Sequence, residues 1–188
     1  MDFIKNWKPP CSIKGVQIFI RFANFYRRFI MEVATICTPI LEILKDDKTK
    51  FYLGPKQNQA FEELKTQFIT PPSLEHFYPD LEKVIEPDAS DFVLGWVLSQ
   101  FKEKRLDPVA FHSRKLNDAE RNYEIHDTEL LAILKGFKEW KHDVVESDRP
   151  NTMYTDHQNL QYLLTTKVWH QRQVRWAQQL ADFNFKII

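Results

Sequence analysis

Apolar residues recur at helical spacing in the first third of the chain. A run that starts after Ser12 places aromatic side chains at intervals of three and four residues, which predicts one aromatic face on a helix. These side chains are Phe19, Phe22, Tyr26 and Phe29. Two further helices are predicted at residues 38–44 and 55–68, the second of them ending before a pair of prolines.

The pattern changes after the prolines between residues 71 and 79. Short β-prone runs separated by turn residues predict strands at residues 83–89, 92–100 and 108–112. The remaining pattern predicts a turn with a short helical piece, a long helix, a strand, two helices and a last strand, at residues 117–123, 127–144, 152–156, 157–164, 171–182 and 183–188. We therefore expect a small helical segment over residues 1–78, followed by an α/β domain over residues 79–188.

Composition narrows the class of protein. The chain has 188 residues, 43% of them hydrophobic, which is enough for one or two small domains. It has only four glycines, and it contains neither of the glycine-rich motifs that bind nucleotide phosphates. Two cysteines, Cys11 and Cys37, are too few for a disulfide framework. No run approaches the ~20 apolar residues of a membrane span, so we expect an intracellular protein of the cytoplasm or nucleus, without a membrane partner.

Charge is balanced over the whole chain but not along it. Lysine and arginine together number 26, as do aspartate and glutamate. Residues 1–30 carry six basic side chains and one acidic side chain, a net charge of +5, which leaves −5 for the rest. Arg21 and Arg28 lie seven residues apart, on a face of the first helix away from the aromatic one. This helix either follows a nucleic-acid backbone or simply presents solvated arginines.

Two acidic residues stand at the ends of predicted strands. Asp88 closes the first strand and Asp156 closes the fourth. Ligands of α/β folds commonly bind at strand ends, so both carboxylates are candidates for a binding site. A turn or a helix N-cap is the alternative, and for Asp156, which directly precedes His157, the cap is as consistent with the sequence as the site.

Glu129 is a third candidate because of its place on the long predicted helix. At ~100° per residue, it falls within about 40° of Ile133 and Trp140, at the edge of the apolar stripe. A carboxylate there is costly to bury unless it is paired or binds a metal. Asp127 and Glu124 are interpreted instead as helix-start and turn residues.

Three inward carboxylates would provide an oxygen-only site for Mg²⁺ or Mn²⁺. Two such ions can stabilise the attacking and leaving oxygens of a phosphodiester displacement. The spacing of Asp88, Glu129 and Asp156 matches no short motif, so it does not by itself show that they converge.

Several longer strings are more specific, and they occur in one order along nearly the whole chain. They are FANFYRRFI at residues 22–30, DASD at 88–91, PVAFHSRK at 108–115, AERNYEIHDTELLAI at 119–133, YTDHQNL at 154–160 and RQVRW at 172–176. Together they closely resemble the Pol polyprotein of Ty3/gypsy-type long-terminal-repeat retrotransposons, from the end of the reverse transcriptase into its ribonuclease H domain.

The resemblance implies that residues from 1 to about 75 form the thumb and connection region of a reverse transcriptase. In that region a basic helix binds the template–primer duplex, which favours a nucleic-acid-binding role for Arg21, Arg27 and Arg28. The polymerase signature Tyr-x-Asp-Asp is absent from the sequence, so no polymerase activity is expected. The remainder of the Pol polyprotein is an expected partner.

For the second part, the resemblance implies a ribonuclease H domain, with a five-stranded mixed sheet and flanking helices. Asp88, Glu129 and Asp156 match the first three acidic metal ligands of that family. The implied reaction is endonucleolytic hydrolysis of the RNA strand of an RNA–DNA hybrid by water, with two Mg²⁺ or Mn²⁺ ions as cofactors.

The sequence departs from the family pattern at several positions. The fourth acidic ligand of the family lies in a segment beyond Ile188, so the domain is expected to be truncated at its C-terminus. Pro87 stands where a polar residue usually precedes the first acid, and a proline removes a strand donor. Arg21 replaces a usual glycine. Residues 142–147 read HDVVES instead of the usual pattern.

Other polar residues lie near the candidate acids. His126 and His157 each neighbour a candidate ligand, where they either move protons or act as capping and supporting groups. Arg172 and Arg175, with Trp176, form either a strip that binds one strand of the hybrid or a packed tryptophan with solvated arginines. Three functions stay open: a metal-dependent nuclease, a catalytically decayed or domesticated nucleic-acid-binding module, and a protein-interaction scaffold.

Overall fold

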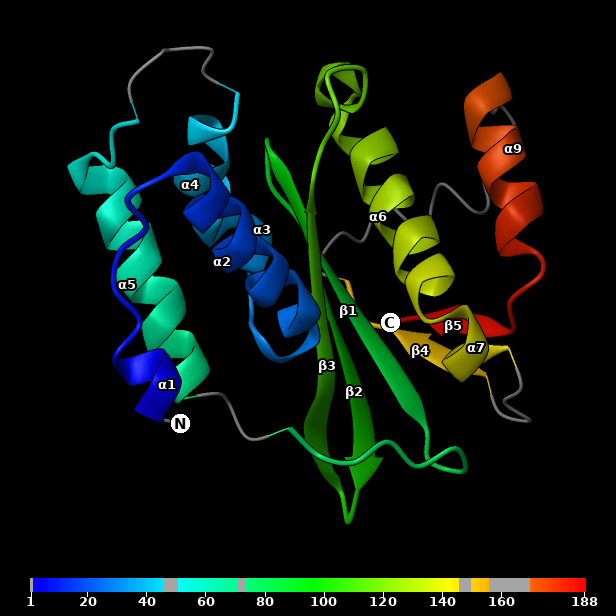
Figure 1. Cartoon of the computed structure of the whole chain (residues 1–188). Helices are drawn as coiled ribbons and strands as arrows, with labels where there is room; N and C mark the ends of the chain where they lie inside the picture. Colours follow the sequence, from blue (N-terminus) through cyan, green and yellow to red (C-terminus); the bar gives the residue numbers. More distant parts are fainter. Residues whose placement is uncertain (1, 46–50, 71–73, 146–149, 156–169) are drawn as a thin grey trace. The chain divides into compact units, whose positions relative to one another are not determined.

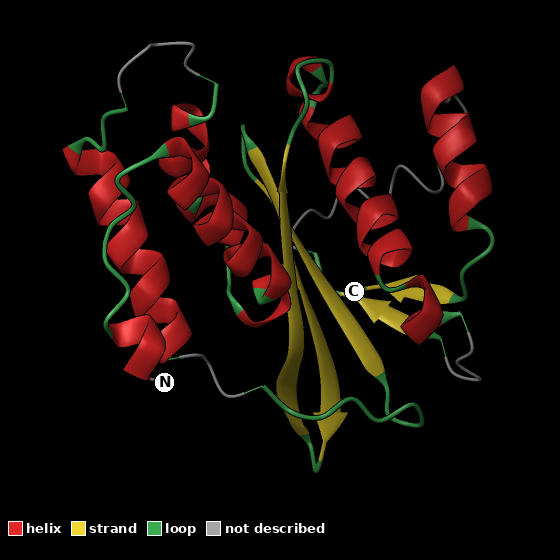
Figure 2. Ribbon diagram, in the orientation of Figure 1, coloured by secondary structure: helices red, strands yellow, loops and turns green. Residues whose placement is uncertain are grey.

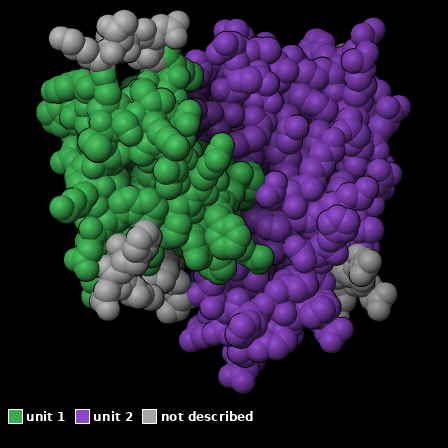
Figure 3. All heavy atoms as spheres, in the orientation of Figure 1, with its two compact units in different colours: residues 1–73, 111–113 green, residues 74–110, 114–188 purple. Residues whose placement is uncertain are grey.

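The computed structural model describes residues 2–45, 51–70, 74–145, 150–155 and 170–188 (Figure 1). The chain forms two compact units, one of residues 1–73 with 111–113, the other of residues 74–110 with 114–188 (Figure 3). The sequence analysis placed the boundary between residues 78 and 79.

The first unit is helical. Its elements are α1 (Asp2–Lys5), α2 (Ile13–Phe25), η1 (Arg27–Phe29), α3 (Val33–Ile36), α4 (Thr38–Ile43) and α5 (Pro55–Ile69). Aromatic side chains dominate its core: the ring centroids of Phe19 and Phe61 lie 4.5 Å apart, and Phe22 and Phe68 meet edge to face at 5.0 Å. Packing of these apolar side chains holds the short helices together.

Helix α2 begins as predicted and ends earlier than predicted. The Ser12 hydroxyl accepts a hydrogen bond from the Gly15 N–H at 3.1 Å and so caps the helix. The helix stops at Phe25, and the chain continues as the short 3₁₀ turn η1. Tyr26 and Phe29 are both partly exposed, but the Tyr26 ring still packs on Phe22 at 4.9 Å and on Phe68 at 6.1 Å. The predicted aromatic face therefore holds as far as Tyr26, and Phe29 lies beyond the helix in η1.

Among the described residues of the second unit, five strands form one mixed sheet in the order β3-β2-β1-β4-β5. The strands are β1 (Lys83–Ala89), β2 (Val93–Lys102), β3 (Arg105–Lys115), β4 (Asn151–Met153) and β5 (Phe185–Ile187). Strand β1 pairs antiparallel with β2 and parallel with β4, and β4 pairs parallel with β5. The predicted fold class is confirmed.

Strands β2 and β3 are longer than predicted, and the turn between them carries no glycine or proline to mark its position in the sequence. Glu103 and Lys104 alone connect them, with φ angles of 51° and 68°. Two consecutive left-handed residues suit the twist of a two-residue hairpin, although side chains other than glycine and asparagine rarely adopt this conformation.

Helices flank the sheet of this unit (Figure 2). They are η2 (Glu120–Asn122), α6 (Ile125–Glu139), α7 (Lys141–Val144) and α9 (Gln171–Leu180). Figure 1 shows α6 alongside β1, with α9 next to α6. The single helix predicted over residues 127–144 is two helices, separated at the buried Trp140. The helix predicted at residues 157–164 lies outside the described residues.

Trp96 and Gly136 fix the position of α6 on the sheet. The indole Nε1 of Trp96, on β2, donates a hydrogen bond of 2.7 Å to the Ala132 carbonyl in the middle of α6. Gly136 follows one turn later, and a Cβ there would lie only 2.8 Å from Trp96 Cδ1 and 3.3 Å from Ile85 Cγ2. The missing side chain therefore allows α6 to approach β1 and β2 closely.

Pro87 does not disturb the pairing of β1 with β2. The Ser90 N–H donates to the Val93 carbonyl at 2.9 Å, which identifies that pair as hydrogen-bonded. Because such pairs alternate along an antiparallel ladder, Pro87, which lies opposite Trp96, occupies a non-hydrogen-bonded position. Its missing N–H is thus not required by β2.

Candidate functional site

Glu129 lies in the first part of α6 and is almost fully buried, with 5% of its surface exposed. The helical wheel placed Glu129 at the edge of the apolar stripe, and in the structure Glu129 is more deeply buried than that position predicts. The Nδ1 atom of His126, one turn earlier, lies 3.8 Å from Glu129 Oε2. Removing a carboxylate from water costs free energy, which a nearby positive charge or a bound cation can offset.

A pocket of about 460 Å³ opens beside Glu129. Its wall on the sheet side is the β1–β2 loop, residues 89–92, and its opposite wall comes from residues 120–129. Phe92 and Tyr123 give it aromatic surface, and Arg121 gives it a positive charge, with the guanidinium 5.8 Å from the centre of the Phe92 ring. Glu129 is therefore accessible from a pocket with a mixed polar and aromatic lining.

Asp88 is exposed at the end of β1, one residue before the pocket wall begins. It lies opposite Gly95 of β2. A Cβ at Gly95 would be 3.8 Å from the Asp88 carbonyl oxygen and 4.0 Å from Asp88 Cβ, distances of ordinary contact. Glycine at this position leaves space beside Asp88.

Asp156 and His157 lie outside the described residues. Strand β4 is described up to Met153, which pairs with Ile85 of β1, and the Tyr154 N–H donates to the Ile85 carbonyl at 3.0 Å. In the sequence, Asp88 follows Ile85 by three residues and Asp156 follows Met153 by three residues. In the described part of the chain, no three His, Cys, Asp or Glu side chains are grouped so as to hold a metal ion. Convergence of the three acids stays a prediction.

Asp127 is the polar residue whose role the sequence analysis missed. It was interpreted as a helix-start acid, yet only 5% of its surface is exposed. Its carboxylate accepts hydrogen bonds from the Arg172 guanidinium and from Gln173 Nε2, the latter at 2.9 Å. Both donors come from the first turn of α9, and their distance in sequence explains why no local pattern reveals the contact.

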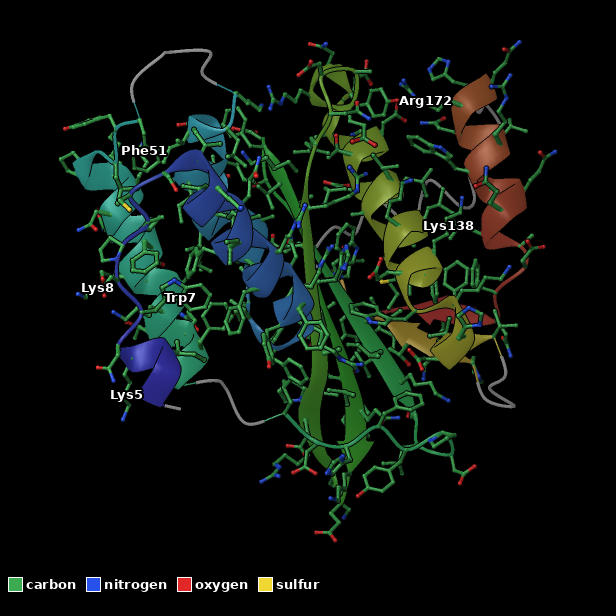
Figure 4. All side chains as sticks on the ribbon, in the orientation of Figure 1. Lys5, Trp7, Lys8, Phe51, Lys138 and Arg172 are labelled. Carbon is green, nitrogen blue, oxygen red and sulfur yellow. The ribbon has the colours of Figure 1, made fainter. Side chains whose placement is uncertain are left out.

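Arg172 is held on three sides. Besides its ion pair with Asp127, its guanidinium lies 3.9 Å from the centre of the Tyr123 ring and 5.6 Å from that of Trp176. Burial acts to lower the pKa of Arg172, but the hydrogen bonds and charges of Asp127 and Tyr123 together raise it. Figure 4 shows Arg172 on the side of α9 that faces α6.

Two further candidate residues lie on α9. Arg175 is exposed. Trp176 is half-buried and packs against the core of the second unit, with its ring centroid 5.9 Å from that of Tyr123. These placements agree with a packed tryptophan.

The basic residues of the first unit also divide into two kinds. Arg21, on α2, and Arg28, in η1, are exposed. Arg27 is half-buried, and its Nη2 donates to the Ser113 carbonyl at 3.0 Å and lies 2.9 Å from His112 Nε2, within the same unit. Arg21 and Arg28 therefore offer the more accessible charges.

No helix in the described ranges is both long enough and apolar enough to cross a membrane.

Comparison with known proteins agrees with the resemblance that the sequence motifs indicated. Residues 78–183 match the family described as the RNase H-like domain found in reverse transcriptase. The Tf2-3 and Tf2-4 transposon polyproteins of Schizosaccharomyces pombe are each 35% identical to this chain over 190 residues. The match covers 100% of this chain but only 14% of each polyprotein.

Solved structures share the fold. A foamy viral protease–reverse transcriptase in complex with double-stranded DNA aligns with a TM-score of 0.81 at 18% identity, over 100% of this chain and 40% of the viral chain. The foamy viral enzyme in complex with an RNA/DNA hybrid aligns with a TM-score of 0.76 at 19% identity, over 99% and 26%. With the match over residues 78–183, the chain belongs to the family of RNase H-like domains found in reverse transcriptases.

Proposed function

We propose that the second unit is a divalent-metal-dependent endonuclease that hydrolyses the RNA strand of RNA–DNA hybrids. The observation that carries this proposal is the position of Glu129, a buried carboxylate that faces a pocket whose other wall begins directly after Asp88. Asp88 stands at the end of β1, the central strand of the five-stranded sheet, and residues 78–183 match the RNase H-like family. The solved foamy viral relative bound to an RNA/DNA hybrid supports the choice of substrate.

The chemistry of the donor set fits Mg²⁺ or Mn²⁺. Asp88 and Glu129 offer only carboxylate oxygens, the ligands that hard divalent cations prefer. Gly95 leaves space beside Asp88, and the pocket gives access to Glu129. We propose that these two residues, with Asp156 at the equivalent position after β4, hold two ions. When bound, the ions would supply a Lewis acid and activate water as the nucleophile.

The residues of the chain have separate tasks in this proposal. Glu129 keeps a fixed position at the pocket, because α6 is anchored through Trp96 and Gly136. His126 Nδ1, close to Glu129, is placed to take or release a proton at the edge of the site. No serine, cysteine or histidine is needed as a nucleophile, since water attacks the phosphodiester.

A cleavage assay on an RNA–DNA hybrid tests the proposal. The hybrid carries a label on the RNA strand, and the assay compares this chain with a version extended past Ile188, each with Mg²⁺, Mn²⁺ or a chelator. We expect metal-dependent cutting of the RNA strand only, and its loss in Asp88→Asn and Glu129→Gln. A His76→Gln variant, which alters a side chain outside the pocket lining, serves as the matched control. Firm hybrid binding without cleavage by either version would contradict the proposal.

A second candidate function is nucleic-acid binding without catalysis by a decayed or domesticated copy. The exposed Arg21 and Arg28 favour nucleic-acid binding, because they provide accessible positive charge for phosphates. Phe25, in the same helical unit, is 78% exposed. Binding that weakens steeply with salt, and that is unchanged when Asp88 and Glu129 are replaced, would identify this function.

A further inference from the structure

We propose that Asp127 and Arg172 act as a positioning pair that fixes the first turns of α6 and thereby orients Glu129. This inference rests on the proposed function, in which Glu129 holds metal. It gives Arg172 a different task from the nucleic-acid contact that its charge and its place in the RQVRW string predict.

The contact lies directly beside the candidate ligand. Asp127 and Glu129 are two residues apart near the start of α6, and both are 5% exposed. Helix α6 has no side-chain hydrogen bond at its N-cap, Glu124, so its first turn is not stabilised in that common way. Instead, the hydrogen bonds from Arg172 and Gln173 to Asp127 attach the first turn of α6 to α9.

Arg172 also contacts two aromatic rings, although 42% of its side chain is exposed. Its guanidinium stacks 3.9 Å from the centre of the Tyr123 ring, and Trp176 lies on the next turn of α9. Tyr123 also lines the pocket beside Glu129. One arginine thus connects α9, a wall of the pocket and the turn of α6 that carries Glu129, and a planar, delocalised cation suits this combination of stacking and ion pairing.

A second contact between the two helices lies far from Glu129 and provides a comparison. Lys138, near the end of α6, donates to the Gln179 side chain near the end of α9 (Figure 4 labels Lys138). Removing this contact loosens the same pair of helices without touching the first turns of α6. Gln179→Ala therefore separates general helix packing from positioning of Glu129.

The decisive variants are Arg172→Gln and Asp127→Asn, with Arg175→Gln and Gln179→Ala as controls. Arg175 lies on the same helix, is exposed like Arg172 and carries the same charge, so its replacement changes the net charge equally. Circular dichroism and thermal unfolding first establish that each full chain is folded. Arg172→Lys, which keeps the charge but loses the planar stacking, is the milder variant if Arg172→Gln does not fold.

Hydrogen exchange in the metal-free protein is the first readout. We expect amides of residues 127–131 to exchange at least tenfold faster in Arg172→Gln and Asp127→Asn, and at the wild-type rate in both controls. Arg172→Lys should give an intermediate rate. This readout depends on neither metal nor substrate, so it tests the positioning role even if the chain cleaves no hybrid.

Cleavage of the labelled hybrid is the second readout. Loss of a group that orients a metal ligand typically costs 10- to 100-fold in metal affinity or activity. We expect Arg172→Gln to lower kcat and raise the Mg²⁺ concentration for half-maximal cleavage by such a factor, with the Kd for hybrid unchanged. Unchanged exchange and an unchanged Mg²⁺ requirement would overturn the inference. A raised Kd alone would also overturn it and identify Arg172 as a nucleic-acid contact. No cleavage by the wild-type chain, with faster exchange in the variants, would contradict only the proposed function.

Discussion

Gly136→Ala tests the close packing of α6 on the sheet. In an open helix, replacing glycine by alanine stabilises the folded state by about 1 kcal/mol, because the helical backbone loses less entropy. At this position the new Cβ would lie 2.8 Å from Trp96 Cδ1 and 3.0 Å from Trp96 Nε1. Trp96 is 3% exposed and is bonded to the Ala132 carbonyl, so it has little room to move away.

Overpacking of a well-packed core costs about 1–3 kcal/mol. Subtracting the gain in helix propensity leaves a net loss of about 1 kcal/mol in the free energy of unfolding. For a chain of this length, such a loss lowers Tm by about 2–4 °C. Urea unfolding followed by circular dichroism measures the free energy directly.

The sign of the effect should reverse when the tryptophan is absent. In a Trp96→Val background, the clash with the indole ring disappears, and Gly136→Ala should stabilise the protein by up to about 1 kcal/mol relative to Trp96→Val alone. If Gly136→Ala raises the stability of the wild-type chain, then α6 is not held against Trp96 as described.

The remaining predictions concern charge. Hydrogen bonds from Arg114 lower the pKa of Glu120 below its ordinary value of 4.5, against the opposing effect of burial. A lowered folded-state pKa adds stability above the unfolded pKa and loses it as pH falls through the folded pKa. Glu120→Gln should therefore lower the free energy of unfolding by about 2 kcal/mol at neutral pH, and by progressively less below pH ~4.5. Urea unfolding at several pH values measures this loss. A loss at pH 3 equal to that at neutral pH would contradict the prediction. Arg21→Gln and Arg28→Gln should each reduce the slope of the logarithm of the nucleic-acid binding constant against the logarithm of salt concentration by about 0.9. Lys56→Gln, on α5, serves as the control and should leave this slope unchanged. Equal effects of all three substitutions would indicate non-specific attraction.

The local signals in the sequence predicted most elements of the fold. Ser12 marks the start of α2, and the alternation of β-prone runs and turns identifies all five strands of the sheet. Errors arose where tertiary contacts decide a boundary. Trp140, which is buried, separates the long helix into two, and the Glu103–Lys104 turn lacks the glycine that would have marked where β2 ends and β3 begins.

Glu129 and Asp127 show why one buried acid could be predicted and the other could not. On a wheel with Glu129 at zero, Asp127 falls at roughly 160°, next to the solvated face of α6. That wheel describes α6 alone, and it correctly places Glu129 beside residues that pack on the sheet. Asp127 is instead covered by α9, whose Arg172 and Gln173 lie about 45 residues further along the chain. Asp127 would be solvated on α6 alone, and it becomes buried because α9 supplies its hydrogen-bond partners. Its role therefore depends on a contact that the spacing of residues within α6 does not predict. The contact is informative because Asp127 is a buried charge, and a buried charge is costly unless it has a partner such as Arg172.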